Sequence, residues 1–241
     1  MAKRMPAGHS LPMASDLLER IKQIVIDRRL PPGAPLPTER ELTELLGTGR
    51  TCVREALKAL QAMGIVEIRH GFGTYVGPMT MAPITEGLAF RTVAGHRRGE
   101  DSLLQLLELR EAVETGLAWR LAGRMPEPDL AELDAIVARM EDEALTGPVR
   151  AETDRAFHAV FCRGLDNPLI DAVPEAFWSA FHRLRDGVRT TAPPDPRTVS
   201  ARHREIVAAV RAGDAVRTEE AIRDHFCDIR TRLRKAYRFA R

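Results

Sequence analysis

After residue 63 the spacing of the apolar residues changes from a helical to a strand period, and that change limits the possible folds more than any other feature. Up to residue 63 the apolar residues recur at helical spacing in three short runs, which proline or glycine ends. The three predicted helices cover about 17–30, 38–47 and 50–63. Residues 65–76 then read as two short strands with the turn His70-Gly71-Phe72-Gly73 between them. Short helices followed by a β-hairpin are typical of a winged helix-turn-helix, which we predict over residues 11–77.

The second half of the chain carries only helical spacing. From Asp101 onward no strand pattern is found, and proline, glycine or Asp-Asn clusters separate the helical runs. The predicted helices cover about 102–124, 128–145, 149–164, 168–190, 198–212 and 215–238. The chain is therefore predicted to be mainly α, with an N-terminal winged helix-turn-helix and a C-terminal all-α bundle of about six helices over residues 101–238. Residues 77–100 contain proline, glycine and threonine with little periodicity, and we expect a linker there.

Composition excludes several classes of protein. The formal net charge is only +2, so affinity for nucleic acid would have to come from a local basic surface. The three cysteines lie far apart and form no CxxC pair, which fits a reducing compartment and not a disulfide framework or a cysteine-rich zinc module. Because the chain shows neither a signal peptide nor a segment that could span a bilayer, we expect a cytoplasmic protein.

A basic stripe follows the third predicted helix. Arg50, Arg54 and Lys58 recur every four residues, on the side opposite the apolar face. By itself such a stripe is more often a solvated helix face. Here it follows a capped helix (Thr38 with Glu41) and a tight turn and precedes a wing, so we interpret it as a surface that reads the major groove of DNA. Arginine donors fit guanine edges or phosphates in pairs.

The stretch LPTERELTELLGTGRTCVREALKALQAMGIVEIRHGFGTYV resembles the DNA-binding domain of the GntR family of bacterial regulators. The shared elements are Leu-Pro-x-Glu-Arg-Glu-Leu, Arg-Thr-x-Val-Arg-Glu-Ala-Leu and a Gly-x-Gly-Thr wing that ends in Val76. The resemblance implies that the residues contacting DNA are Arg40, Arg50, Thr51, Arg54, His70 and Gly71. Gly49 departs from the family, which usually has Ser or Thr there. Glycine is a weaker helix cap and has no hydroxyl for a phosphate, so we expect slightly weaker or differently spaced contacts with the DNA backbone, without loss of function.

Four residues of the second half could hold a metal ion. Asp154 and His158 are one helical turn apart, and His203 and His225 lie among the apolar residues of two later helices. Each histidine alone is more often a hydrogen-bonded core residue than a metal ligand. Three imidazoles and one carboxylate together suit zinc, nickel, iron or manganese and leave coordination positions open. The spacing does not show that the three helices meet.

A second resemblance connects these residues. Asp154-x-x-Phe157-His158, then His203-x-x-Ile206, then Asp224-His225 is similar to the C-terminal, FCD-type domain of the FadR-like branch of the same family. The resemblance implies a divalent metal ion, zinc first, held by Asp154, His158, His203 and His225. It also implies that the effector is a small organic acid or amino acid whose carboxylate binds at or beside the metal. His96 and His182 fall outside the pattern and are interpreted as structural.

Arg110 is the remaining candidate. It lies on the inward stripe of the first predicted bundle helix, four residues before Glu114. An arginine in that stripe must be paired or must face a cavity, because burying it alone is costly. Two interpretations remain open: an ion pair with Glu114, or a bidentate clamp on the carboxylate of an effector.

These features predict a regulator and not an enzyme. We expect a sequence-specific transcription regulator, a repressor, that binds an inverted-repeat operator as a homodimer and responds to a small carboxylate. Two alternatives are a metal-dependent hydrolase fused to a winged helix, since an open three-histidine site can activate water, and a direct metal sensor. No spare base or nucleophile motif supports the hydrolase.

Overall fold

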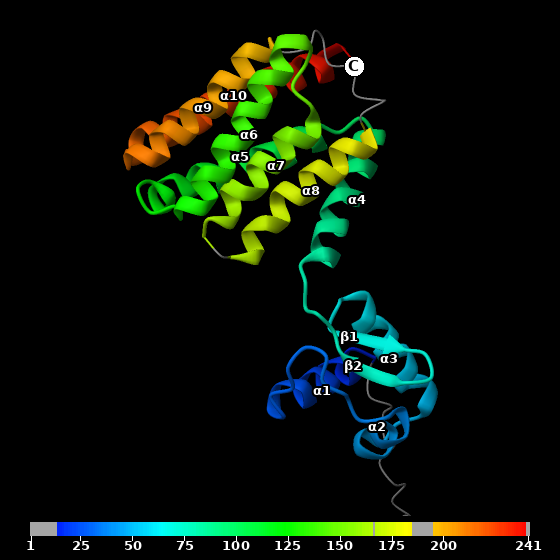
Figure 1. Cartoon of the computed structure of the whole chain (residues 1–241). Helices are drawn as coiled ribbons and strands as arrows, with labels where there is room; N and C mark the ends of the chain where they lie inside the picture. Colours follow the sequence, from blue (N-terminus) through cyan, green and yellow to red (C-terminus); the bar gives the residue numbers. More distant parts are fainter. Residues whose placement is uncertain (1–13, 166, 185–194, 240–241) are drawn as a thin grey trace, which may run out of the picture. The chain divides into compact units, whose positions relative to one another are not determined.

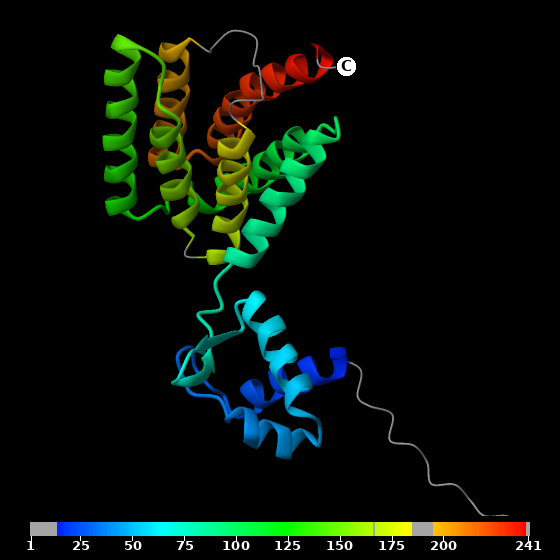
Figure 2. The same ribbon diagram turned by 90° about the vertical axis from the view of Figure 1, so that its right-hand side faces the viewer.

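The computed structural model describes residues 14–165, 167–184 and 195–239. The chain divides between Pro83 and Ile84 into two compact units, an N-terminal unit and a helical unit, each with its own core. Figures 1 and 2 show the elements of both units in two views. Residues 11–13 of the predicted DNA-binding domain and 185–190 of the predicted fourth bundle helix lie outside the described residues.

The N-terminal unit is a three-helix domain with a β-hairpin. Its elements are α1 (Ala14–Asp27), α2 (Glu39–Leu46), α3 (Arg50–Ala62), β1 (Val66–Arg69) and β2 (Gly73–Val76). The capping box starts α2: the Glu41 amide donates to Thr38 Oγ1 at 3.3 Å, and the Thr38 amide donates to the Glu41 carboxylate at 2.7 Å. Gly47 ends the helix at φ 63°, a left-handed conformation that favours glycine. Gly49 caps α3 without a side-chain hydrogen bond, as the sequence predicts.

The hairpin is antiparallel, with Val66 opposite Val76 and Arg69 opposite Gly73. The segment before α2 also pairs with β2, because the Leu36 amide donates to the Thr74 carbonyl and the Val76 amide to the Ala34 carbonyl. The apolar faces of the helices and Val66 and Val76 bury a separate small core. The wing is therefore fixed to the helices at its base, while its turn projects from them.

The helical unit contains the six predicted bundle helices and one more. The bundle helices are α5 (Ser102–Leu121), α6 (Glu127–Thr146), α7 (Ala151–Arg163), α8 (Pro168–Leu184), α9 (Pro196–Ala212) and α10 (Ala215–Phe239). Each packs on two others, α6 on α7 and α9, α8 on α7 and α5, and α10 on α5 and α9. These pairs close into a ring, so side chains from different helices can meet at its centre. The elements agree with the predicted fold class.

The expected linker is largely a helix. Residues Ala82–Arg97 form α4, whose buried residues are Ala89, Thr92 and Gly95. A face of small and polar residues gives no apolar period, which is why the spacing did not reveal it. The face allows close packing: a Cβ on Gly95 would lie 2.9 Å from the Cβ of Ser102, whose hydroxyl donates to the Thr92 carbonyl at 2.7 Å.

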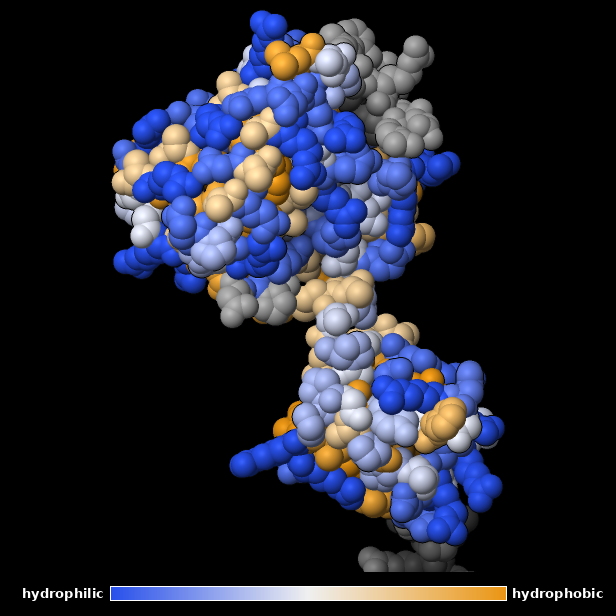
Figure 3. All heavy atoms as spheres, viewed as in Figure 1, coloured by the Kyte–Doolittle hydropathy of each residue, from blue (hydrophilic) through white to orange (hydrophobic). Residues whose placement is uncertain are grey.

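The face in Figure 3 is mostly hydrophilic, and its hydrophobic side chains are scattered in small areas. Ion pairs connect α6 with α9, where Arg204 and Arg211 both contact Asp134 at 2.9 and 2.6 Å. Within the described part of the chain, no helix combines the length and the apolar character needed to cross a membrane.

Candidate metal centre and DNA-reading surface

The basic stripe of α3 is exposed. Arg50, Arg54 and Lys58 face solvent, while the opposite side of the helix packs into the core of the N-terminal unit. Arg54 Nε lies 2.9 Å from Glu39 Oε2 of α2, and both side chains are largely exposed. An exposed ion pair of this kind contributes roughly 0–1 kcal/mol, so Arg54 can exchange it for DNA at little cost.

The other residues expected at DNA are also accessible. Arg40 is exposed on α2, Thr51 is exposed in the first turn of α3, and His70 and Gly71 form the exposed turn of the wing. Gly71 has φ +80° and no atom within 4 Å of where a Cβ would stand, so its backbone conformation is what favours glycine there. All six residues that the sequence suggested for DNA contact are therefore exposed in the structure and belong to the N-terminal unit.

Four candidate metal ligands lie together inside the ring of helices. Asp154 and His158 come from α7, His203 from α9 and His225 from α10. One ligand atom from each lies within 4.8 Å of the others, and the three imidazoles are buried. Asp154 Oδ1 is 3.0 Å from His203 Nε2 and 3.9 Å from His158 Nε2. The ring thus brings together residues that are up to 71 positions apart in the sequence.

The histidine tautomers suit metal binding. His203 Nδ1 donates to the Val199 carbonyl at 2.8 Å, and a carbonyl can only accept, so Nδ1 carries the proton. His158 Nδ1 lies 2.5 Å from the carboxylate oxygen Glu114 Oε2, which accepts in the same way. The Nε2 atoms of His158, His203 and His225 are buried and form no hydrogen bond with the described residues. These orphaned nitrogens fit the arrangement in which one ring nitrogen is held and the other binds a metal.

The protonation states of the cluster also suit metal binding. Burial would raise the pKa of Asp154, but the close approach of His203 and the neighbouring imidazoles of His158 and His225 outweigh burial and hold the pKa well below its usual value. Burial lowers the pKa of His225, and the neighbouring histidines lower it further. The pKa of His158 is also lowered, by burial and by the charge of Arg110. An ionised carboxylate and neutral imidazoles are the forms that a metal ion requires.

Of the two interpretations of Arg110 that the sequence left open, the ion pair with Glu114 is present. The Arg110 side chain is fully buried, and Nε donates to Glu114 Oε1 at 2.6 Å. Its Nη1 and Nη2 atoms have no hydrogen-bond partner among the described residues. Three rings surround the guanidinium, with centroids at 4.8 Å (Phe177), 5.2 Å (Phe226) and 5.4 Å (Trp178). The ion pair therefore fixes Arg110 and leaves its two outer donors free.

Glu114 joins Arg110 to the histidine cluster. One of its oxygens accepts from Arg110 and the other from His158, 44 positions along the chain. Burial would raise the pKa of Glu114, but His158 and Arg110 outweigh that effect and the pKa is lowered. The sequence indicated only the contact with Arg110, because nothing in the spacing relates α5 to α7.

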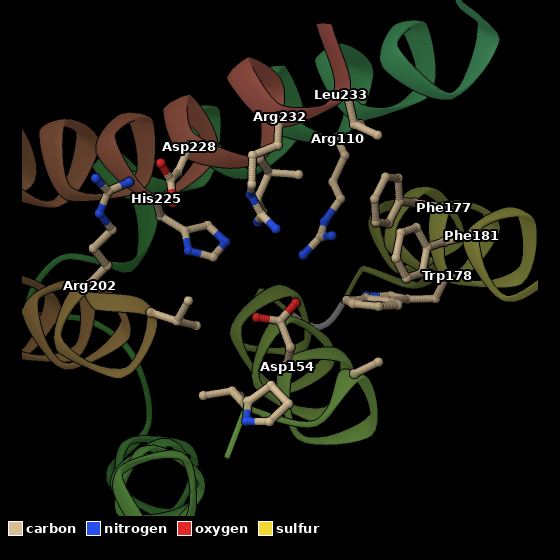
Figure 4. A pocket seen from close by; sticks show the side chains of 15 residues that line it. Arg110, Asp154, Phe177, Trp178, Phe181, Arg202, His225, Asp228, Arg232 and Leu233 are labelled. Atoms are coloured by element: carbon tan, nitrogen blue, oxygen red, sulfur yellow. The ribbon is translucent and has the colours of Figure 1, made fainter. Parts of the chain in front are cut away.

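A cavity of about 220 Å³ opens onto this group. Arg110, Asp154 and His225 line it together with aromatic side chains of α8. Figure 4 shows the guanidinium groups of Arg110 and Arg232 and the carboxylate of Asp154 pointing into this space. Arg202 and Arg232 also line it, and the sequence analysis missed both. Arg232 follows His225 by two helical turns on α10, and that spacing was the available signal.

We expect Glu114→Gln to weaken metal binding about 10- to 100-fold, since loss of an outer-shell partner of a ligating histidine has effects of this size. Competition with a zinc-chelating dye measures the affinity. Glu111→Gln is the matched control, because Glu111 lies on the same helix as Glu114 and forms an ion pair with Arg230 of α10, outside the cluster. Unchanged zinc affinity in Glu114→Gln would show that Glu114 serves only to neutralise Arg110.

The two units together define a class of protein. A winged helix-turn-helix with an exposed basic helix, carried on the same chain as a bundle with a buried polar cavity, is the architecture of a ligand-responsive transcription regulator. Residues 13–76 match the family model described as bacterial regulatory proteins, gntR family, and residues 105–228 match the FCD domain. The chain belongs to the GntR family of bacterial transcription regulators and carries an FCD domain, as its two resemblances indicated. The members of this family are regulators and not enzymes.

The chain is similar over nearly its whole length to known regulators. It is 32% identical to the uncharacterized HTH-type transcriptional regulator Rv0494 of Mycobacterium tuberculosis, over 90% of this chain and 88% of that protein. It is 26% identical to the galactonate operon transcriptional repressor of Escherichia coli, over 83% of this chain and 87% of that protein. The solved structure of a Streptococcus agalactiae GntR protein has a TM-score of 0.66 and 26% identity, covering 91% of this chain and 99% of that chain.

Proposed function

We propose that this chain is a repressor whose operator binding is controlled by a small carboxylate, held at a divalent metal ion in the helical unit. The observation that carries the proposal is the cavity onto which the free donors of Arg110 and the Asp154 and His225 side chains converge. In this proposal residues 11–77 are the DNA-binding domain and residues 101–238 the sensing domain. Helix α4 is assigned to the sensing domain as well, because its Ala89 belongs to the core of the helical unit. The protein acts in the cytoplasm, where its DNA target lies.

The metal ligands in this proposal are Asp154, His158, His203 and His225. Three nitrogen donors and one carboxylate suit zinc best, while nickel, manganese and iron accept the same set. When bound, a divalent ion supplies positive charge and open coordination positions for an anionic group. Glu114 and the Val199 carbonyl hold the two imidazoles that they contact in the orientation the metal needs.

Arg110 binds the effector carboxylate in this proposal. A guanidinium with two free, parallel donors forms a bidentate contact with a carboxylate, and Glu114 and the aromatic rings fix it before the ligand arrives. Galactonate, which the Escherichia coli repressor is named after, is a hydroxy carboxylate. The name of this relative supports a repressor role and a carboxylate as the effector of the present chain.

The experiment that tests the proposal compares metal-loaded and chelator-treated protein on an operator selected from random DNA. Galactonate and lactate serve as probes, and fluorescence anisotropy reports DNA binding. We expect a carboxylate to release DNA only from the metal-loaded protein. Release by zinc alone would favour the direct metal sensor, and equal release from both preparations would remove the cluster from the effector site.

We expect Arg110→Lys to keep its metal but to bind the carboxylate about 10- to 100-fold more weakly. Lysine keeps the charge and loses the two-donor fork, which removes one charge-assisted hydrogen bond in a buried site. Calorimetric titration of the zinc-loaded variant measures the affinity, and Arg120→Lys, exposed on the same helix, is the control. A lowered melting temperature with wild-type carboxylate affinity would mean that Arg110 acts only through its ion pair with Glu114.

The DNA-bound form is expected to be a homodimer on a short inverted repeat, because one recognition helix contacts too few base pairs for useful specificity. Footprinting should show two protected half-sites related by a two-fold axis. Sedimentation at the same concentration should give twice the mass of one chain. A monomer that protects a single half-site would contradict this prediction.

A further inference from the structure

One arginine of the cavity, Arg232, has neither a protein partner nor a role in the function proposed above. Arg232 extends from α10 into the cavity, and Figure 4 shows its guanidinium beside the space that Arg110 and Asp154 also face. Its Nε is buried and has no hydrogen-bond partner, and no described carboxylate forms an ion pair with it. Burial lowers the pKa of Arg232, which the charge of Asp228 partly offsets.

The other two arginines of the cavity are held in place by the protein. Arg110 is fixed by Glu114, and Arg202 donates to the Asp224 carbonyl. A half-buried guanidinium without a partner is unfavourable unless a ligand completes its hydrogen bonds. Arg232 therefore differs from both in having no hydrogen-bond partner among the described residues, so all its donors are available to a molecule in the cavity.

The charges around the cavity point to the kind of molecule. Three arginines (Arg110, Arg202, Arg232) face three carboxylates, those of Asp154 and Asp228 in the lining and that of Glu114 behind Arg110. These charges cancel, so a bound divalent ion would leave two uncompensated positive charges. One carboxylate would neutralise half of that excess, and two would neutralise all of it.

We propose that the effector is a short dicarboxylate, with its first carboxylate at the metal and Arg110 and its second at Arg232. The inference rests on the proposed function, because it places the first carboxylate at the same site. The aromatic side chains in the cavity lining could also suit an effector with an apolar tail. Phe177 and Trp178, however, already pack on the Arg110 guanidinium, so they do not require one. The cavity volume of about 220 Å³ restricts the ligand to a short chain.

Calorimetric titration of the zinc-loaded full chain tests the proposal. Succinate, glutarate and adipate are compared with the monocarboxylates of the same length, butyrate, valerate and hexanoate. We expect the best dicarboxylate to bind about 10- to 100-fold more tightly than its matched monocarboxylate, which is the effect of one buried charge-assisted contact. Arg232→Gln should abolish that preference and lower monocarboxylate affinity much less than dicarboxylate affinity, and Arg232→Lys should restore part of the preference.

The control variant is Arg234→Gln, an exposed position on the same helix, which should keep the preference. Zinc content is measured after each titration to show that the dicarboxylate has not removed the metal. A preference that survives Arg232→Gln, or tighter binding of hexanoate than of adipate, would overturn the dicarboxylate assignment alone. If neither series binds the zinc-loaded wild type, the proposed carboxylate site itself is wrong.

Discussion

Replacing His203 or His225 with alanine is expected to empty the metal site and to make the melting temperature of the helical unit independent of added zinc. Both imidazoles are buried within the cluster, and each would lose a directly bound ligand atom. The loss should exceed the roughly 10- to 100-fold effect of an outer-shell change. A metal present at about a thousand times its dissociation constant stabilises by about 4 kcal/mol. For a unit of this size, that corresponds to a melting temperature higher by roughly 10 °C.

Elemental analysis and melting curves with and without zinc measure the effect. The reference is chelator-treated wild type, because alanine also leaves a cavity that lowers stability in both conditions. His182→Ala is the control, since His182 is exposed on α8 and lies outside the cluster. The proposal fails if wild-type protein holds no stoichiometric metal, cannot be loaded with zinc, nickel or manganese, and still responds to a carboxylate.

Arg54→Ala is expected to remove most sequence-specific operator binding while the fold is retained. A bidentate contact with a base is worth about 1–3 kcal/mol, and a dimer on two half-sites would lose it twice. Operator affinity should therefore fall roughly thirtyfold or more. The protein itself loses only the exposed pair with Glu39, so its melting temperature should hardly change.

Anisotropy titrations on operator and on scrambled DNA of equal length separate specific from general binding. Arg54→Ala should affect the operator more than the scrambled sequence, because loss of a base contact reduces discrimination. Gln61→Ala is a matched control at an exposed position of the same helix. An equal decrease on both DNAs would make Arg54 a phosphate contact, and no decrease would exclude it from the DNA-reading surface.

Much of the fold followed from the sequence because most helices bury an apolar face. The leucine stripe of α5 and the capping box of α2 are examples whose spacing or local hydrogen bonds depend on neighbouring residues only. Helix α4 was not predicted, for a physical reason. Its buried residues Ala89, Thr92 and Gly95 are small, and two of them are not apolar side chains, so they give no apolar periodicity. The family resemblance gave the class of domain for both units.

The candidate site was predictable only in part. The i, i+4 relation of Arg110 to Glu114 is local, so the sequence indicated the ion pair that the structure contains. The contact of Glu114 with His158 and the meeting of α7, α9 and α10 depend on the closed ring of helices, which no spacing describes. Arg232 was missed because what distinguishes it is a buried donor without a hydrogen-bond partner, and a sequence does not show which donors are unpaired.

The position of α4 has a consequence for engineered biosensors. Its Glu86 pairs with Arg183 at 2.5 Å, and its Ala89 belongs to the core of the helical unit. A chimera that takes its DNA specificity from another regulator should therefore be joined between Gly77 and Ala82, where the chain is neither strand nor helix. A junction placed after α4 would replace α4 with the corresponding helix of the other regulator. The side chains of that helix would not match the surfaces of α5 and α8, and a residue larger than glycine at position 95 would clash with Ser102.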